Sequence, residues 1–208
     1  NVIAIAAGVK LVKLFAPEHG AAGTAGDPPI VTVVSQQLDR ETAEAGLTFE
    51  LLKLMLSLGA RRIAAFLPTD TEPPIAEFLE LAHYQGVVIL TPRAHEDGSM
   101  SWVVYHPDHD QVRSLLGVPE IAEGEGLPTV ETLALVDLIL VPAAAVDQQG
   151  TRLGWGKGFY DRALDSVATT APVCAVVFDD EVYPALPAQP HDQPVSGAVT
   201  PTRTLALG

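Results

Sequence analysis

The sequence predicts an α/β fold in three layers, with a mostly parallel central β-sheet flanked by helices. Short runs of β-branched and aliphatic residues alternate with longer amphipathic stretches, as in chains whose strands are connected by helices. The chain has 208 residues, enough for one well-filled core but hardly for two. Hydrophobic residues make up 48% of it and charged residues 18%, so apolar burial can offset the entropy lost on folding. We therefore expect residues 1–208 to form one domain.

Six apolar runs are predicted as strands. They are residues 31–34, 62–67, 86–91, 101–105, 138–142 and 173–178. Residues 47–58 and 74–85 are predicted as helices, because apolar side chains recur with helical spacing and a glycine follows each stretch where a helix can end. Residues 113–127 and 184–197 are rich in glycine or proline and are predicted connections.

The N-terminal part, residues 1–60, is atypical, and its first 46 residues show the weakest pattern. A strand at 2–7 and a loop at 17–29 are predicted, the loop because it holds three glycines and three prolines. Within the segment 14–20, Leu-Phe-Ala-Pro-Glu-His-Gly resembles a segment of exo-N-acetylmuramidases. A carbohydrate-active enzyme is therefore the lowest-ranked functional hypothesis.

Charge and apolar patterning exclude several classes of partner. Asp and Glu number 26 against 12 Lys and Arg, a formal charge of −14 that would repel nucleic acid and anionic lipid. The longest apolar runs fall short of the roughly 20 residues that a membrane span needs, and the start lacks the basic region of a secretory signal. The only cysteine, Cys174, lies in an apolar run and reads as a core residue. We expect a cytoplasmic protein that is a monomer or a weak homodimer.

A glycine-rich loop after the predicted strand 138–142 is the strongest candidate for a binding site. Gly154, Gly156 and Gly158 alternate with larger residues, so the backbone can adopt positive φ angles and present successive N–H groups to an anion. Lys157 and Arg152 add positive charge, and a helix begins just after the loop. The pattern favours a polyphosphate; the alternative is a tight turn in which glycine only relieves strain.

The whole segment 141–162 helps to decide between a polyphosphate site and a structural turn. It reads Val-Pro-Ala-x-Ala-Val-Asp-x-x-Gly-x-Arg-Leu-Gly-x-Gly-x-Gly-Phe-Tyr-Asp-Arg, which resembles the signature of 5-formyltetrahydrofolate cyclo-ligases. It lacks the Gly-Lys-Ser/Thr ending of a P-loop and the spacing of a dinucleotide fingerprint. The resemblance covers about two thirds of the chain and continues through residues 71–75, 87–93, 175–181, 190–195 and 198–201.

The resemblance implies an ATP-dependent ligase with a fold of the NagB/RpiA/CoA-transferase type. In the family, the formyl oxygen of 5-formyltetrahydrofolate attacks the γ-phosphate of ATP, and a second folate nitrogen then closes the ring to 5,10-methenyltetrahydrofolate with release of ADP and phosphate. Such chemistry requires alignment and neutralisation of charge rather than a protein nucleophile. The alternative is a non-catalytic module that binds nucleotide or folate.

The resemblance also assigns residues to roles. The ATP-binding set would be Arg152, Gly154, Trp155, Gly156, Lys157, Gly158, Phe159 and Tyr160. Lys157 and Tyr160 would act in catalysis, with Lys157 nearest the transferred phosphoryl group. Trp155 and Phe159 would stack on the pterin. Glu72 would lie near the formyl-bearing end of the folate, a role that Asp70 could take instead; the alternative for Glu72 is a surface acid before a helix.

Magnesium is the implied cofactor, with Asp161 and Asp192 as its ligands. The alternatives are a carboxylate stabilised by the helix dipole for Asp161 and a turn residue for Asp192. His191 is expected to form hydrogen bonds within its loop.

Other features are expected to be structural. His95, His106 and His109 have no recognisable ligand spacing and are predicted in a solvated loop. Trp102 is expected to pack from a strand. The family's basic N-terminal helix, which helps bind ATP, is not recognisable: Lys10 and Lys13 do not match it.

Overall fold

The computed structural model describes residues 40–114, 117–156, 158–188 and 192–208, together with the backbone of three short N-terminal strands. These strands, β1 (Ala4–Ala6), β2 (Val9–Val12) and β3 (Val31–Val33), pair antiparallel in the order β1-β2-β3. They confirm the strands predicted near 2–7 and 31–34. The predicted loop 17–29 and the segment 14–20 lie outside the described residues.

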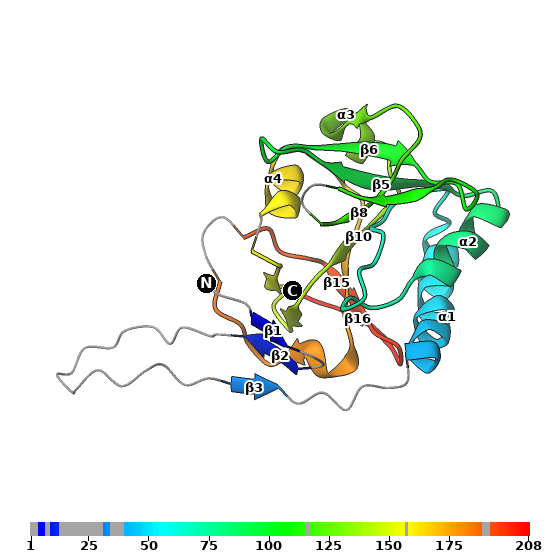
Figure 1. Ribbon diagram of the computed structural model, residues 1–208. Coiled ribbons are helices and arrows are strands. Elements are labelled where there is room, and N and C mark those ends of the chain that lie inside the picture. The colour runs from blue at the N-terminus through cyan, green and yellow to red at the C-terminus, as the bar shows by residue number, and fades with distance from the viewer. Residues whose placement is uncertain are drawn as a thin grey trace, which may run out of the picture.

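An eight-stranded mixed sheet forms the centre of the protein (Figure 1). In sheet order its strands are β16 (Thr204–Ala206), β15 (Gly197–Val199), β13 (Val173–Val176), β10 (Leu138–Pro142), β4 (Arg62–Ala64), β5 (Val88–Ala94), β6 (Met100–Val104) and β9 (Leu127–Pro128). The run from β15 to β5 is parallel throughout, and β16, β6 and β9 are antiparallel to their neighbours. The predicted mostly parallel sheet is confirmed.

Two hydrophobic cores lie on opposite faces of this sheet, which gives three layers. Along β10, Leu138 and Leu140 belong to the core under helices α1 (Arg40–Leu58) and α2 (Ala76–Tyr84). Ile139 and Val141 belong to the other core, to which α3 (Thr129–Leu133) and α4 (Phe159–Asp165) contribute. This alternation is the two-residue period of a strand buried on both faces. Figure 1 shows α1 and α2 side by side on one side of the sheet and α4 on the other.

The predicted helix ends are confirmed by backbone geometry. Gly59 follows α1 with a φ of +61°, and Gly86 follows α2 with a φ of +81°, values that favour glycine after a helix. The start of α1 differs from the prediction, because the helix begins at Arg40 instead of residue 47. Its first turns carry few large apolar residues, so the periodicity that marks the later turns is missing there.

Several short strands were not predicted. Residues 113–127 were expected to form a connection, but β7 (Gln111–Arg113) and β8 (Pro119–Ile121) form an antiparallel hairpin. Ile121 is buried. Arg93 donates hydrogen bonds to the carbonyl oxygens of residues 121–124, and the shortest is 2.8 Å from Nη2 to the oxygen of Ile121. A second small sheet contains β11 (Ala145–Asp147), β12 (Arg152–Leu153) and β14 (Val182–Tyr183). These strands are too short to show an alternating pattern.

The two residues expected to pack in the core, Trp102 and Cys174, are both buried. Trp102 is fully buried and packs in the core between the sheet and α3–α4, as expected. Cys174 is buried, and burial raises the pKa of its thiol to about 11. Within the described ranges, no helix has the length and apolar character of a membrane span.

A close approach between α1 and the C-terminal segment yields a stability prediction. A β-carbon added at Gly46 would lie 2.2 Å from the carbonyl oxygen of Pro201. Gly→Ala inside a helix normally stabilises by up to about 1 kcal/mol. We expect Gly46→Ala instead to lower the free energy of unfolding in urea by about 1–3 kcal/mol, because the backbones must separate.

The control is Ala45→Gly at the exposed neighbouring position. It should cost only about 0.5–1 kcal/mol of helix propensity. A stabilised Gly46→Ala protein would show that α1 does not approach Pro201 this closely.

Candidate functional site

The glycine-rich loop connects the hairpin β11–β12 to α4 at the carboxyl end of β10. Gly156 and Gly158 have φ angles of +86° and +66°, so the predicted positive-φ conformation is confirmed at these two, whereas Gly154 does not adopt it. Gly158 is the residue that immediately precedes α4. A β-carbon at Gly154 would lie 2.9 Å from Nη1 of Arg152, so glycine lets the loop pass over this guanidinium. Lys157 lies outside the described residues, and its role stays a prediction.

Asp147 holds the turn of the β11–β12 hairpin and was not singled out from the sequence. It is buried, and its Oδ1 accepts hydrogen bonds from the backbone N–H groups of Gln149 and Thr151 at 3.0 and 2.8 Å. Its Oδ2 accepts one from the N–H of Leu186 at 2.8 Å. The carboxylate thus ties the turn before the glycine-rich loop to the segment after β14. Asp two residues before Gln-Gly is a turn signal that could have identified it.

Arg152 lies beneath the loop and is paired with protein groups. Its side chain is 3% exposed, and its Nη2 donates to Oδ1 of Asp161 at 2.6 Å. Its Nη1 donates to the carbonyl oxygen of Pro142, the last residue of β10, at 3.3 Å. Arg152 therefore joins the end of a central strand to the first turn of α4. Its predicted contact with phosphate stays a prediction.

Tyr160 presents a buried hydroxyl in the same region. Among the described residues this oxygen has no hydrogen-bond partner. Burial raises the pKa of Tyr160 and the nearby negative charge of Glu72 raises it further, while Arg152 acts in the opposite direction. The hydroxyl therefore stays protonated at physiological pH and can act as a donor. A buried polar atom without a partner in the protein is common where a ligand or water binds.

Glu72 lies in the turn after β4 and is buried, which rejects the surface-acid alternative. Its Oε2 accepts hydrogen bonds from the backbone N–H and the Oγ1 of Thr69, at 2.8 and 2.9 Å. Its negative charge adds to the effect of burial in raising the pKa of Tyr160. Asp70, the alternative acid, is 95% exposed and lies 3.6 Å from Arg113. The structure thus brings Glu72, Tyr160, Arg152 and Asp161 into one region at the carboxyl edge of the sheet.

The predicted stacking residues lie on the loop and the start of α4. Trp155 and Phe159 are half-buried. The guanidinium of Arg162 lies 5.2 Å from the ring centroid of Phe159, and its Nε donates to the carbonyl oxygen of Gly98 at 3.1 Å. This contact connects α4 to the turn between β5 and β6.

The predicted magnesium ligands are Asp161, in the first turn of α4, and Asp192, in the segment before β15. Asp161 is 21% exposed, and Asp192 is half-buried. Gln193 donates a hydrogen bond from Nε2 to Oδ1 of Asp165 at 3.1 Å, so the residue after Asp192 contacts the last residue of α4. Within the described part of the chain, no group of three or more His, Cys, Asp or Glu side chains is arranged to hold a metal ion. His191 lies outside the described residues.

Comparison with known proteins identifies the family. A model of the 5-formyltetrahydrofolate cyclo-ligase family matches residues 33–201. The chain belongs to this family. A 5-formyltetrahydrofolate cyclo-ligase of Mycolicibacterium smegmatis is 39% identical over 153 residues, which cover 71% of this chain and 77% of that protein. A protein of the same name from Escherichia coli is 31% identical over 150 residues, covering 69% of this chain and 80% of its own.

A solved structure supports the same assignment. The 5,10-methenyltetrahydrofolate synthetase of Aquifex aeolicus has a TM-score of 0.64 and is 25% identical, with coverage of 82% of this chain and 85% of that one. The match to the cyclo-ligase family includes the Glu72 turn, the glycine-rich loop and Asp192. The match to the family is therefore not confined to the glycine-rich signature.

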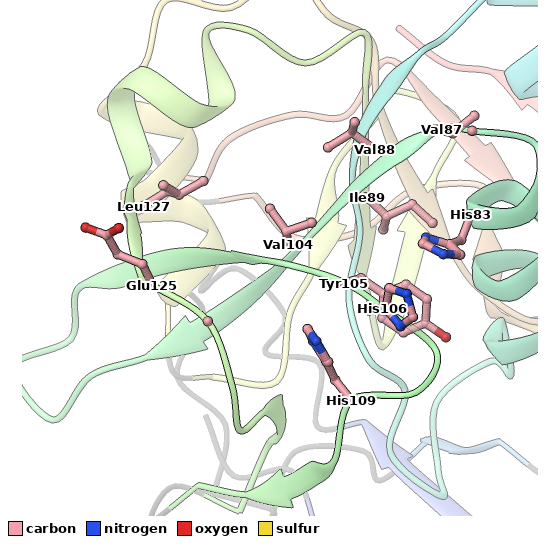
Figure 2. Close-up of a pocket in the computed structure, with 12 residues that line it drawn as sticks. His83, Val87, Val88, Ile89, Val104, Tyr105, His106, His109, Glu125 and Leu127 are labelled. Atoms are coloured by element: carbon pink, nitrogen blue, oxygen red, sulfur yellow. The ribbon is translucent and has the colours of Figure 1, made fainter.

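The histidines lie elsewhere on this cyclo-ligase family member. His106 and His109 were expected in a solvated loop, but both are half-buried and line a cavity of about 490 Å³ together with His83 (Figure 2). The ring centroids of His83 and His106 are 4.7 Å apart. The cavity is formed around the start of β5 and the end of β6, at the edge of the sheet opposite the glycine-rich loop. His95 lies apart from it and contacts Ser101 at 3.0 Å.

The contacts of Asp147 yield a second stability prediction. Asp147→Asn replaces one acceptor oxygen with an amide donor, so the hydrogen bonds of the hairpin turn and the bond to Leu186 cannot all be kept. We expect a loss of about 1–3 kcal/mol in the free energy of unfolding, measured in urea. Asp110→Asn, at an exposed position, should change stability by less than about 0.5 kcal/mol. Equal stability of the two variants would contradict the role given to Asp147.

Proposed function

We propose that this chain catalyses the ATP-dependent conversion of 5-formyltetrahydrofolate to 5,10-methenyltetrahydrofolate, with release of ADP and phosphate. The observation that carries the proposal is the match to the cyclo-ligase family across residues 33–201, which include a glycine-rich loop with positive φ angles at Gly156 and Gly158. The buried carboxylate of Glu72 and the buried hydroxyl of Tyr160 supply a hydrogen-bond acceptor and a donor. This combination fits a site that must hold a folate and a nucleotide together.

The reaction proceeds in two steps. The formyl oxygen attacks the γ-phosphorus of ATP, the bond to the bridging oxygen of ADP breaks, and a phosphorylated intermediate forms. The folate N10 then attacks the formyl carbon, loses its proton, and expels inorganic phosphate as the five-membered ring closes. Neither step needs a protein nucleophile, so the protein must align the two substrates and neutralise the phosphates.

The loop is proposed to hold the triphosphate. Backbone N–H groups between Gly154 and Tyr160 and the ammonium of Lys157 supply the positive potential. Arg152 contributes its positive charge from below while it remains bonded to Asp161. Since the chain carries a formal charge of −14, this local arrangement is what attracts a polyanion.

Glu72 and Tyr160 are proposed to position the folate. Thr69 fixes one oxygen of Glu72, and this restricts the orientation in which the carboxylate can accept an N–H of the substrate. The hydroxyl of Tyr160 donates to a substrate oxygen. Trp155 and Phe159 stack on the pterin ring.

Asp161 and Asp192 are proposed as magnesium ligands. Two carboxylates completed by substrate phosphates form the oxygen-rich set that Mg²⁺ prefers. Asp161 fits this role because Arg152 engages its Oδ1 and orients the carboxylate from the buried side. The ion would neutralise charge on the phosphates when ATP is bound.

The activity is tested by the absorbance of methenyltetrahydrofolate formed from 5-formyltetrahydrofolate. We expect a signal that requires both ATP and magnesium and is abolished in Lys157→Ala, while Arg61→Ala at an exposed position retains full activity. ADP release should match product formation. Binding of both substrates without ADP release would instead establish the non-catalytic module.

Tyr160→Phe separates catalysis from stability. Because the Tyr160 hydroxyl has no partner among the described residues, its removal should leave the free energy of unfolding unchanged or slightly higher. The loss of a hydrogen bond to substrate should lower kcat/KM for 5-formyltetrahydrofolate by roughly 10–100-fold. Tyr84→Phe, at a side chain that is 72% exposed, is the matched control. Wild-type kinetics in Tyr160→Phe would remove the hydroxyl from the proposed site.

A further inference from the structure

Arg40, the first residue of α1, contacts the turn that carries Glu72. Its Nη1 donates to the carbonyl oxygens of Asp70 and Glu72 at 2.9 and 3.2 Å, and its Nη2 donates to that of Thr69 at 3.4 Å. One guanidinium therefore holds three of the four carbonyl groups between residues 69 and 72. The partner is the backbone of the turn, so no sequence motif marks this contact.

The position of Arg40 in its helix is electrostatically unfavourable. The N-terminus of a helix carries partial positive charge, and anionic side chains are stabilised there while cationic ones are not. Arg40 begins α1. The cost of its position is offset by the carbonyl groups that its guanidinium binds.

A second side chain of α1 fixes the other end of the same segment. Glu44, one helical turn after Arg40, accepts a hydrogen bond from the N–H of Glu77 at 3.3 Å, in the first turn of α2. Ile75, the N-cap of α2, provides no side-chain hydrogen bond to the helix. Arg40 and Glu44 thus hold the segment between residues 69 and 77 at both ends, with Glu72 between them.

Helix α1 is itself anchored, so it can serve as a fixed support. Glu50 is buried and accepts a hydrogen bond from Oγ1 of Thr204 in β16 at 2.9 Å. The hydrogen bond from Lys53 lowers the pKa of Glu50, and that from Thr204 acts in the same direction. Gly46 allows the helix to approach Pro201 closely. The position of Arg40 is therefore set by the central sheet.

We infer that Arg40 is a positioning residue for Glu72. It sets the position of the 69–72 turn, and through that turn the direction of the Glu72 carboxylate. The inference rests on the proposed function, in which Glu72 contacts the folate. It extends that function by assigning part of folate recognition to the first turn of α1, on the far side of the turn from the substrate.

The inference is tested by steady-state kinetics on Arg40→Ala, Arg40→Lys, Glu72→Gln and the double variant, in the full chain. Arg40→Ala should raise KM for 5-formyltetrahydrofolate roughly tenfold with KM for ATP unchanged, because a small displacement of a contact group weakens alignment. Arg40→Lys keeps the charge and a donor and should restore part of the loss. Arg61→Ala is the control for removing an exposed arginine at the opposite end of β4.

The Arg40→Ala, Glu72→Gln double variant separates the positioning role of Arg40 from the folate contact of Glu72. If Arg40 acts through Glu72, adding Arg40→Ala to Glu72→Gln should change KM for folate by less than about twofold, since the effects of coupled residues do not add. A full tenfold effect in the Glu72→Gln background would overturn the inference and leave the role of Glu72 intact. Wild-type kinetics in Glu72→Gln itself would overturn both. Thermal unfolding identifies any variant that loses activity by unfolding, and Arg40→Lys then carries the test.

Discussion

The ion pair between the buried Arg152 and the partly exposed Asp161 is the interaction on which the site depends. A guanidinium that is 3% exposed must be paired, because an unpaired buried charge is strongly destabilising. Its partners are the first turn of α4 and the carbonyl oxygen of Pro142 at the end of β10. Helix α4 has seven residues and could not be stable alone. The pair, together with the buried Ala163 and Leu164, determines where this helix starts and therefore where the glycine-rich loop ends.

The turn that carries Glu72 depends on α1, which packs on the face of the sheet opposite α4. Glu72 is held by Thr69 within its own turn and by Arg40 from outside it. The loop half and the turn half follow β10 and β4, two neighbouring parallel strands. Their carboxyl ends lie at the same edge, which is where parallel sheets place ligands. The fold thus brings together side chains that are almost 90 residues apart, from Glu72 to Tyr160.

Features with strong local signals could be predicted from the sequence. The central strands follow from their aliphatic runs, the ends of α1 and α2 from Gly59 and Gly86, and the loop conformation from Gly156 and Gly158. The hairpins β7–β8 and β11–β12 could not, because strands of two or three residues have no measurable period. Arg40 was missed because its partners are carbonyl groups 30 residues away. The cavity beside His106 and His109 needs His83 from α2, a proximity that only the tertiary structure creates.

Hydrogen–deuterium exchange with and without 5-formyltetrahydrofolate tests most directly where the substrate binds. We predict slower exchange in the 69–72 turn and in the start of α4 after the glycine-rich loop, with no change around His106 and His109. The histidine-lined cavity of about 490 Å³ at the opposite edge of the sheet is an internal reference, because no folate is proposed to bind there. Protection at that cavity with unchanged exchange at the Glu72 turn would contradict the site described above.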